Sequence, residues 1–167
     1  TSKFLGLGYP GGPIIDNLSK KGNPIFKFSK PKINDYDFSF SGLKTSIIYF
    51  IKKELKKNSK FIEDNINDLC SSIQHSIVEI LVEKTIKCAI DLNIKQICIV
   101  GGVSANSHLR EKLNSECLIN KFDLFYPKIN YCTDNAAMIA VSGYFNHLNK
   151  KFSDLDIVPK KLKIILP

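Results

Sequence analysis

The chain has 167 residues, of which 44% are hydrophobic and 24% charged, and it carries a formal net charge of +8. This length suffices for one domain with a single hydrophobic core, and the composition excludes a chain that is disordered throughout. No apolar run approaches the roughly 20 residues of a membrane-spanning helix and no signal peptide is recognisable, so we expect a soluble protein with no membrane contact.

The first part of the chain is predicted to be mainly helical. A turn rich in proline and glycine at 9–13 leads into a short helix over 13–22. Two prolines make 23–37 extended or irregular. Apolar residues then recur at helical spacing over 41–58 and over 62–92, which predicts an amphipathic helix with a basic outer side and then a longer helix. We expect both helices to pack on a sheet.

The second part of the chain alternates strands with helices. A short apolar run at 96–100 ends at two glycines and predicts a buried parallel strand. We expect a helix over 106–114, a strand over 122–131, and a helix over 133–148 whose small residues allow close packing against a neighbour. This order of elements indicates an α/β protein with helices on a mainly parallel sheet, and the whole chain, 1–167, is treated as one domain.

The turn after the strand at 96–100 is a candidate ligand site. Gly101 and Gly102 allow the main chain to approach a ligand, and the following helix N-terminus favours phosphate. Nucleotides bind beyond the carboxyl ends of parallel strands, next to such turns. The spacing is not that of a dinucleotide-binding GxGxxG motif. An ordinary tight turn capped by Asn106 or Ser107 accounts for the same residues, so both interpretations stay open.

Two aspartates lie at positions where a carboxylate has either a structural or a functional role. Asp134 is expected in the first turn of the last helix, with Thr133 as its cap, where the helix dipole favours negative charge. The alternative is a metal ligand, although one carboxylate cannot hold a metal ion alone. Asp16 follows Gly12 and is either a helix-surface residue or a contact to the hydroxyl groups of a ligand.

The remaining polar residues carry weaker signals. The histidines at 75, 108 and 147 form no HExxH or HxxxH pair, so we expect them to be structural or exposed. Lys44 lies where a lysine could reach phosphate, but the start of a helix with an aromatic staple explains its segment as well. Five cysteines without a CxxC pair favour free thiols inside a cell over disulfides or a cysteine zinc site. The net charge allows a nucleic-acid partner without requiring one.

Four motifs together resemble one family. They are GLGYPGGP at 6–13, DFSFSGLKT at 37–45, GGVSAN at 101–106 and CTDNAAMIA at 132–140. In this order and at these spacings they are similar to the tRNA N6-adenosine threonylcarbamoyltransferases, a family once labelled O-sialoglycoprotein endopeptidases. The resemblance covers nearly the whole chain but only the C-terminal half of a family member. The protease activity of the old label lacks a zinc and general-base motif here.

The resemblance implies a fold and a set of missing parts. Family members consist of two actin-like ATPase lobes, which are related to ribonuclease H, with a nucleotide cleft between them. This chain then corresponds to part of the C-terminal lobe, without the first strands of that lobe. The N-terminal half, with an HxxxH motif that supplies two metal ligands, is also missing. The chain begins at Thr1 and its one methionine is Met138, so we expect it to be part of a longer protein.

The resemblance also implies a reaction. Family members transfer the threonylcarbamoyl group from threonylcarbamoyl-AMP to N6 of the adenosine beside the anticodon of tRNA. An iron or zinc ion assists this acyl transfer. Asp134 matches the family's metal-binding aspartate, and Gly12, Asp16 and Asn106 match positions that hold the adenylate, next to the turn at 101–102. The resemblance assigns no catalytic residue of this chain.

From these matches we expect the chain to be inactive alone and to need the missing half, in the same polypeptide or as a separate one. Its expected partners are tRNA, threonylcarbamoyl-AMP and other subunits of the same pathway. We expect it in the cytoplasm, or else in a mitochondrion or plastid. The alternative function is a non-catalytic actin-like scaffold, or dimerisation partner, of the same pathway.

Overall fold

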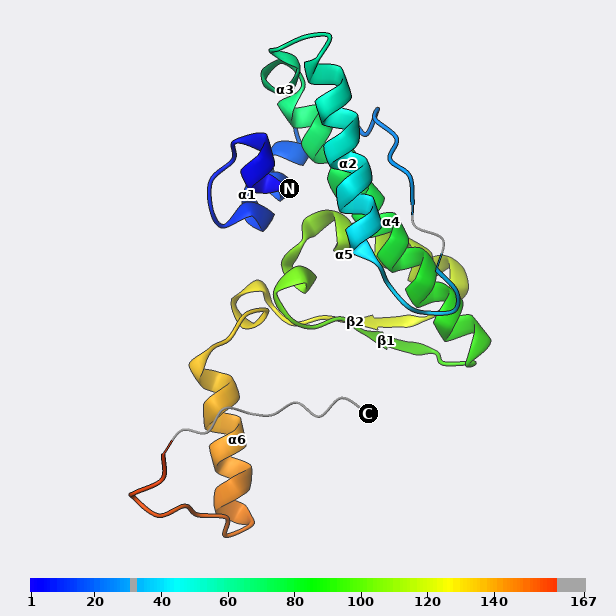
Figure 1. Ribbon diagram of the computed structural model, residues 1–167. Coiled ribbons are helices and arrows are strands. Elements are labelled where there is room, and N and C mark those ends of the chain that lie inside the picture. The colour runs from blue at the N-terminus through cyan, green and yellow to red at the C-terminus, as the bar shows by residue number, and fades with distance from the viewer. Residues whose placement is uncertain (31–32, 159–167) are drawn as a thin grey trace. The chain divides into compact units, whose positions relative to one another are not determined.

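The computed structural model describes residues 1–30 and 33–158 (Figure 1). The chain divides into two compact units, Thr1–Cys132 and Thr133–Pro167, which we call the first and the second unit. The first unit holds the sheet and the helices α1 to α5, and the second unit holds α6. Among the described residues, no helix is both long enough and apolar enough to cross a membrane.

Helices α1 to α4 precede the first strand in the first unit (Figure 1), and short 3₁₀ helices are labelled η. In chain order the elements are η1 (Ser2–Leu5), α1 (Gly11–Ser19), α2 (Phe40–Leu55), α3 (Phe61–Asp64), α4 (Ile66–Asp91), β1 (Gln96–Cys98), η2 (Gly102–Ala105), α5 (Ser107–Asn120), β2 (Asp123–Phe125) and η3 (Ile129–Tyr131). The helix predicted after the glycine turn is present, and it is longer than expected.

The two strands form a parallel sheet in which Ile97 pairs with Leu124. α5 connects the two strands, because a parallel pair needs a crossover rather than a hairpin. The parallel α/β arrangement is thus confirmed. The expectation of longer, buried strands over 96–100 and 122–131 is wrong: each strand has three residues, and of the paired residues only Ile97 is buried. Phe125 is 52% exposed, because the described helices of the first unit pack on one face of the sheet.

α4 contributes to both hydrophobic cores of the first unit. Leu69 of α4 packs in the core shared with α2, while Val82 packs in the core shared with α5 and β1. The single helix predicted over 62–92 is wrong in one respect, because the chain breaks at Asn65 into α3 and α4. The Asn65 side chain donates to the carbonyl oxygen of Phe61 at 2.9 Å, a local bond that competes with the helical ladder.

α2 confirms the amphipathic helix predicted over 41–58. Leu43, Ile47 and Ile51 are buried, and the lysines of the helix are exposed. The buried side chains belong to a core cluster whose described members include no strand residue. The expectation that α2 packs on a sheet is therefore wrong. α2 packs on α4 instead, and α4 and α5 cover the sheet.

α1 is shorter than the helix predicted over 13–22, and the chain that follows it passes close to α4. A Cβ atom on Gly22 would lie 2.3 Å from the carbonyl carbon of Asn67, so no larger residue fits there without a shift. The N–H of Asn23 then donates to Oδ1 of Asp68 at 2.7 Å. Glycine is thus required by the contact with α4 rather than by the end of α1.

The segment 23–37 is extended or irregular, as predicted, except that 31–32 lie outside the described residues. Lys84 of α4 fixes its later part, because Nζ donates to the carbonyl oxygens of Ile33 and Asp35 at 3.1 and 2.8 Å. Backbone groups that lack a sheet or helix partner are satisfied in this way by a side chain.

α6 (Ala136–Leu148) is the helix of the second unit. Its cap is Asn135, whose Oδ1 accepts from the N–H of Met138 at 3.3 Å. The cap predicted at Thr133 is therefore wrong, and Asp134 precedes the helix instead of lying in its first turn. The side chains of α6 are exposed, so the close packing predicted for its small residues is not seen within the described part of this unit.

Candidate functional site

A hollow of about 460 Å³ opens in the first unit between α1 and the turn that follows β1. It is lined by Gly12, Pro13, Asp16, Gly102, Val103, Ala105, Asn106 and Ile129. Four residues predicted from the sequence, Gly12, Asp16, Gly102 and Asn106, therefore meet in one place although they come from distant parts of the chain. The fifth predicted residue, Gly101, does not line the hollow but directly precedes Gly102 in the chain.

The start of α1 forms one wall of the hollow and leaves its main chain accessible. Gly12 lies in the first turn, where N–H groups have no partner within the helix. Pro10 in the capping position makes no side-chain hydrogen bond to them. A Cβ built on Gly12 would have no other atom within 4 Å, so the space beside this residue is open. A ligand can therefore approach the backbone closely here.

Asp16 lies one turn after Gly12, and its carboxylate is held from three directions. Oδ1 accepts from Oγ of Ser107 at 2.9 Å and from Nε2 of Gln74 at 3.1 Å. Oδ2 lies 3.5 Å from Nζ of Lys20, and the side chain is 18% exposed. An ionised carboxylate has about four lone-pair positions, so this one can still accept hydrogen bonds from hydroxyl groups in the hollow.

Gln74 of α4 joins Asp16 to Asn106 and is 6% exposed. Its Nε2 also donates to Oγ of Ser19 at 2.8 Å, and its Oε1 accepts from Nδ2 of Asn106 at 2.8 Å. The motifs do not single out this residue, because its partners in α1 and before α5 are 58 and 32 residues away. The feature that could have identified Gln74 is its polar side chain at a buried position of a helix whose other buried residues are mostly apolar.

The turn after β1 forms the other wall and needs glycine at its first position. Gly101 has φ 81° and ψ 175°, a conformation essentially restricted to glycine. Oγ of Ser104 donates to the carbonyl oxygen of Gly101 at 2.7 Å. Asn106 then caps α5, because its Oδ1 accepts from the N–H of Leu109 at 2.9 Å. Of the two caps that the sequence leaves open, Asn106 is confirmed.

Arg110 fixes this turn against the chain that follows β2. Its Nε donates to the carbonyl oxygen of Ser104, and Nη2 donates to the carbonyl oxygen of Pro127 at 2.9 Å. Nη2 also lies 3.2 Å from Sγ of Cys132, and the guanidinium carbon is 4.5 Å from the ring centre of Tyr126. One side chain therefore connects the glycine turn, the chain that follows β2 and the end of the first unit.

Asp134 belongs to the second unit, where it is exposed and precedes α6. Among the described residues, no three histidine, cysteine, aspartate or glutamate side chains lie together as the ligands of a metal ion do. A carboxylate supplies one hard oxygen donor, whereas iron and zinc sites need several ligands. Asp134 therefore fits as one ligand of a site whose other donors come from elsewhere, and its metal role stays a prediction.

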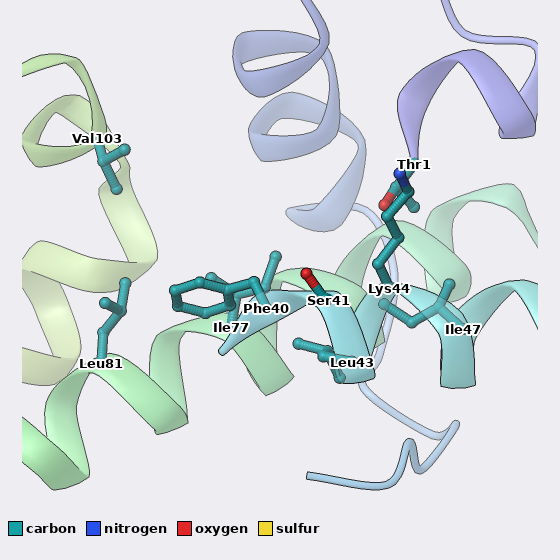
Figure 2. A pocket seen from close by; sticks show the side chains of 9 residues that line it. All are labelled: Thr1, Phe40, Ser41, Leu43, Lys44, Ile47, Ile77, Leu81 and Val103. Atoms are coloured by element: carbon teal, nitrogen blue, oxygen red, sulfur yellow. The ribbon is translucent and has the colours of Figure 1, made fainter. Parts of the chain in front are cut away.

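A second hollow, of about 580 Å³, lies beside α2 and α4 (Figure 2). Most of its lining is apolar, with side chains such as Leu43 and Leu81. Figure 2 shows Lys44 extending toward Thr1 in this hollow. Lys44 does not line the hollow that Asp16 lines. The structure therefore gives Lys44 no part in the candidate site.

His75 and His108 lie next to each other, with ring centres 5.7 Å apart, and neither lines the hollow. Nε2 of His75 is 3.2 Å from Oε1 of Glu79. Burial, together with the nearby His75, lowers the pKa of His108. These contacts lie within and between α4 and α5, which is consistent with the structural role expected for both histidines.

Comparison with known proteins places this arrangement in a family. The family model described as TsaD, tRNA N6-adenosine threonylcarbamoyltransferase, matches residues 1–141. The chain belongs to this family. The resemblance read from the four motifs is thereby confirmed. Every residue of the hollow, and Asp134 as well, lies in the part that matches the threonylcarbamoyltransferase family.

Curated relatives in the threonylcarbamoyltransferase family carry the same name. The protein of Riemerella anatipestifer is 51% identical over 154 residues, which are 92% of this chain and 45% of the relative. That of Porphyromonas gingivalis is 46% identical over 159 residues, 95% of this chain and 47% of the relative. The protein of Fervidobacterium nodosum is 50% identical over 147 residues, which are 85% of this chain and 42% of the relative. The chain thus spans about half the length of the curated relatives it matches.

Proposed function

We propose that this chain forms part of a tRNA N6-adenosine threonylcarbamoyltransferase. The enzyme would move the threonylcarbamoyl group from threonylcarbamoyl-AMP to N6 of the adenosine next to the anticodon of tRNA. The observation that carries the proposal is the hollow in which Gly12, Asp16 and Asn106 meet. Family membership and the names of the relatives support the same reaction.

The walls of the hollow offer what an adenylate needs. The open backbone at Gly12 offers N–H groups to a phosphate, as helix N-termini do. The carboxylate of Asp16 accepts from the hydroxyl groups of a ribose, and Asn106 keeps one amide hydrogen for an acceptor of the nucleotide. The turn at 101–102 lets the main chain approach the same ligand.

The reaction is an acyl transfer in which AMP is the leaving group. The N6 amine of the adenosine attacks the carbonyl carbon of the threonylcarbamoyl group and loses a proton. The bond from that carbon to a phosphate oxygen breaks, and AMP leaves with the electron pair. The residues of the hollow would hold the AMP portion, which keeps the carbonyl in a fixed position for attack. We assign no catalytic base to the described residues.

We propose that Asp134 supplies one ligand to an iron or zinc ion. Two histidines would complete the ligand set, from a segment that corresponds to the half of the relatives outside the matched region. Such an ion, when bound, would polarise the acyl donor and stabilise developing negative charge. The exposure of Asp134 supports this role, because its carboxylate has no hydrogen bond or ion pair with any residue that the structure describes. Its contribution is to hold the ion by a hard oxygen donor.

We propose further that the first unit belongs to an actin-like lobe. Activity would also need a segment equivalent to the other half of the relatives, which lies outside the region that this chain matches. The exposed face of the sheet at Phe125 and the exposed Val100 support a neighbour there. We call the chain together with that half, joined or separate, the assembled protein. We expect it to act in the cytoplasm with tRNA and with other subunits of the pathway, and the positive net charge suits RNA.

The test is to measure threonylcarbamoyladenosine in tRNA by mass spectrometry of digested nucleosides. The chain is expressed alone and with a matching N-terminal half, and modification is expected only from the assembled protein. Robust activity of the chain alone would refute the need for the other half. Absence of activity in a folded assembled protein supplied with the pathway's other subunits would refute the function.

The Asp134→Ala variant separates an enzyme from a scaffold. In a threonylcarbamoyltransferase this change should abolish modification and metal content while the fold and the assembly stay intact. In a non-catalytic scaffold it should change neither. Asp154→Ala is the matched control, because Asp154 is an exposed aspartate of the same unit outside the four motifs.

A further inference from the structure

Gln74 is the one buried amide side chain among the described residues, and both ends of its amide are used. Nε2 donates to the carboxylate of Asp16 and to the hydroxyl of Ser19, while Oε1 accepts from Nδ2 of Asn106. The hydroxyl of Ser19 in turn donates to the backbone carbonyl oxygen of Asp16 at 2.8 Å. These partners define which end of the Gln74 amide is nitrogen, because two of them accept and one donates.

This network settles the orientation of the Asn106 amide. Its Oδ1 accepts from the N–H of Leu109, and one hydrogen of Nδ2 goes to Gln74. The second hydrogen of Nδ2 has no acceptor among the described residues and is left as a donor. At Asp16, Oδ1 already accepts from Gln74 and Ser107, and the free lone pairs remain acceptors. The hollow therefore offers a donor from one wall and an acceptor from the other.

We infer that Gln74 is a positioning residue for the adenylate, acting through Asp16 and Asn106; this inference rests on the proposed function. Gln74 does not line the hollow, so it does not touch the ligand itself. A buried amide gains little stability over an apolar side chain of the same shape, since its hydrogen bonds mainly offset its desolvation. Its specific effect is to hold a carboxylate and an amide, from two different elements, in one fixed relation.

Two variants change this network in different ways. Gln74→Glu keeps the size and an acceptor for Asn106 but replaces the donor that faces Asp16 with a second carboxylate. Gln74→Met removes both polar ends at similar volume. The matched control is Ser76→Ala: Ser76 is also buried in α4, at 7% exposed, and within the described part of the chain its hydroxyl donates to the backbone oxygen of Ser72 alone.

The experiment measures AMP affinity by calorimetry, and KM and kcat for threonylcarbamoyl-AMP, in the assembled protein. Both Gln74 variants should bind AMP about tenfold more weakly near pH 7.5 and raise KM more than they lower kcat, the size expected for losing a hydrogen bond to a charged group. The AMP phosphate also gains a proton in this range, so affinities are compared with the wild type at the same pH, and on that scale the Glu variant alone should recover affinity toward about pH 5.5. Burial and the neighbouring Asp16 raise the pKa of a carboxyl at position 74, and its protonated form donates again. Ser76→Ala should match the wild type.

A double variant tests whether Gln74 acts through its neighbour. If it does, Gln74→Met should weaken AMP binding less once Asn106→Ala is present, because only the bond to Asp16 is then left to lose, whereas independent structural damage should add in full. AMP affinity within twofold of wild type in both single variants, or an additive double variant, would overturn the inference and leave the proposed function standing. Failure of the wild-type assembled protein to bind AMP would overturn the adenylate site itself. If the Glu variant does not fold, the Met variant and the double variant still decide.

Discussion

The carboxylate of Asp16 accepts a hydrogen bond of 2.9 Å from the hydroxyl of Ser107, a residue 91 positions later in the chain. This bond joins the helix after the first glycine motif to the helix after the second. Since both motifs contribute to the lining of one hollow, it fixes the separation of the two walls between which we place the adenylate. Changes at Asp16 should therefore affect ligand binding before they affect the fold.

Asp16→Asn should raise the KM for threonylcarbamoyl-AMP by about tenfold or more in the assembled protein, because a charged acceptor for ribose hydroxyls becomes a neutral one. The free energy of unfolding should change by less than about 1 kcal/mol, since the new amide oxygen still accepts from Ser107. Steady-state kinetics of the assembled protein give the KM. Urea denaturation of this chain gives the free energy of unfolding. Asp123→Asn, at an exposed position outside the hollow, is the control and should leave both unchanged.

Two glycines should respond in opposite ways to alanine. Gly22→Ala should lower the free energy of unfolding by about 1–3 kcal/mol, because the new Cβ overlaps the backbone at Asn67. Gly12→Ala should leave stability unchanged or raise it by up to about 1 kcal/mol, since its Cβ enters open space and alanine favours the helix. The same Cβ narrows the hollow, so AMP affinity should fall. A destabilised Gly12→Ala, or an unaffected Gly22→Ala, would contradict these assignments.

The turn after β1, which forms one wall of the candidate site, could be predicted from the sequence because it depends on residues that are close together in the chain. The glycines at 101–102, the cap at Asn106 and the parallel pairing each follow from turn and strand chemistry within a few residues. Gln74 could not be predicted in the same way, since its role depends on partners that tertiary packing brings to it.

The misplaced elements have equally physical reasons. An apolar run such as 96–100 predicts burial, but burial depends on what covers the strand, and the described helices cover one face only. The break at Asn65 follows from a side chain that bonds to the backbone one turn earlier, which periodicity does not register. Thr133 and Asn135 both suit a helix cap, and only the structure decides for Asn135.

The five thiols should differ sharply in reactivity. Cys98 is exposed, whereas Cys70 and Cys117 are buried, and burial raises the pKa of Cys70 to about 11. At about pH 8 a disulfide reagent such as Ellman's should label Cys98 rapidly, and should label Cys70, Cys117 and the equally buried Cys132 only after unfolding, because the thiolate is the reactive form. Cys98→Ser should remove the fast phase, and peptide mass spectrometry should locate it. Rapid labelling of Cys70 in the native chain would contradict the burial of this core.

His108 should make the stability of the chain depend on pH. Burial lowers its pKa, with a further contribution from His75, so the folded state favours the neutral ring. Between that lowered value and the ordinary value near 6.5, the unfolded chain binds more protons, and stability should fall as pH decreases from about 7. In His108→Gln this loss should be smaller, as urea denaturation at a series of pH values would show. The exposed His147 gives the control variant His147→Gln, which should keep the wild-type slope. An unchanged slope in His108→Gln would mean that the loss of stability arises from the carboxylates instead.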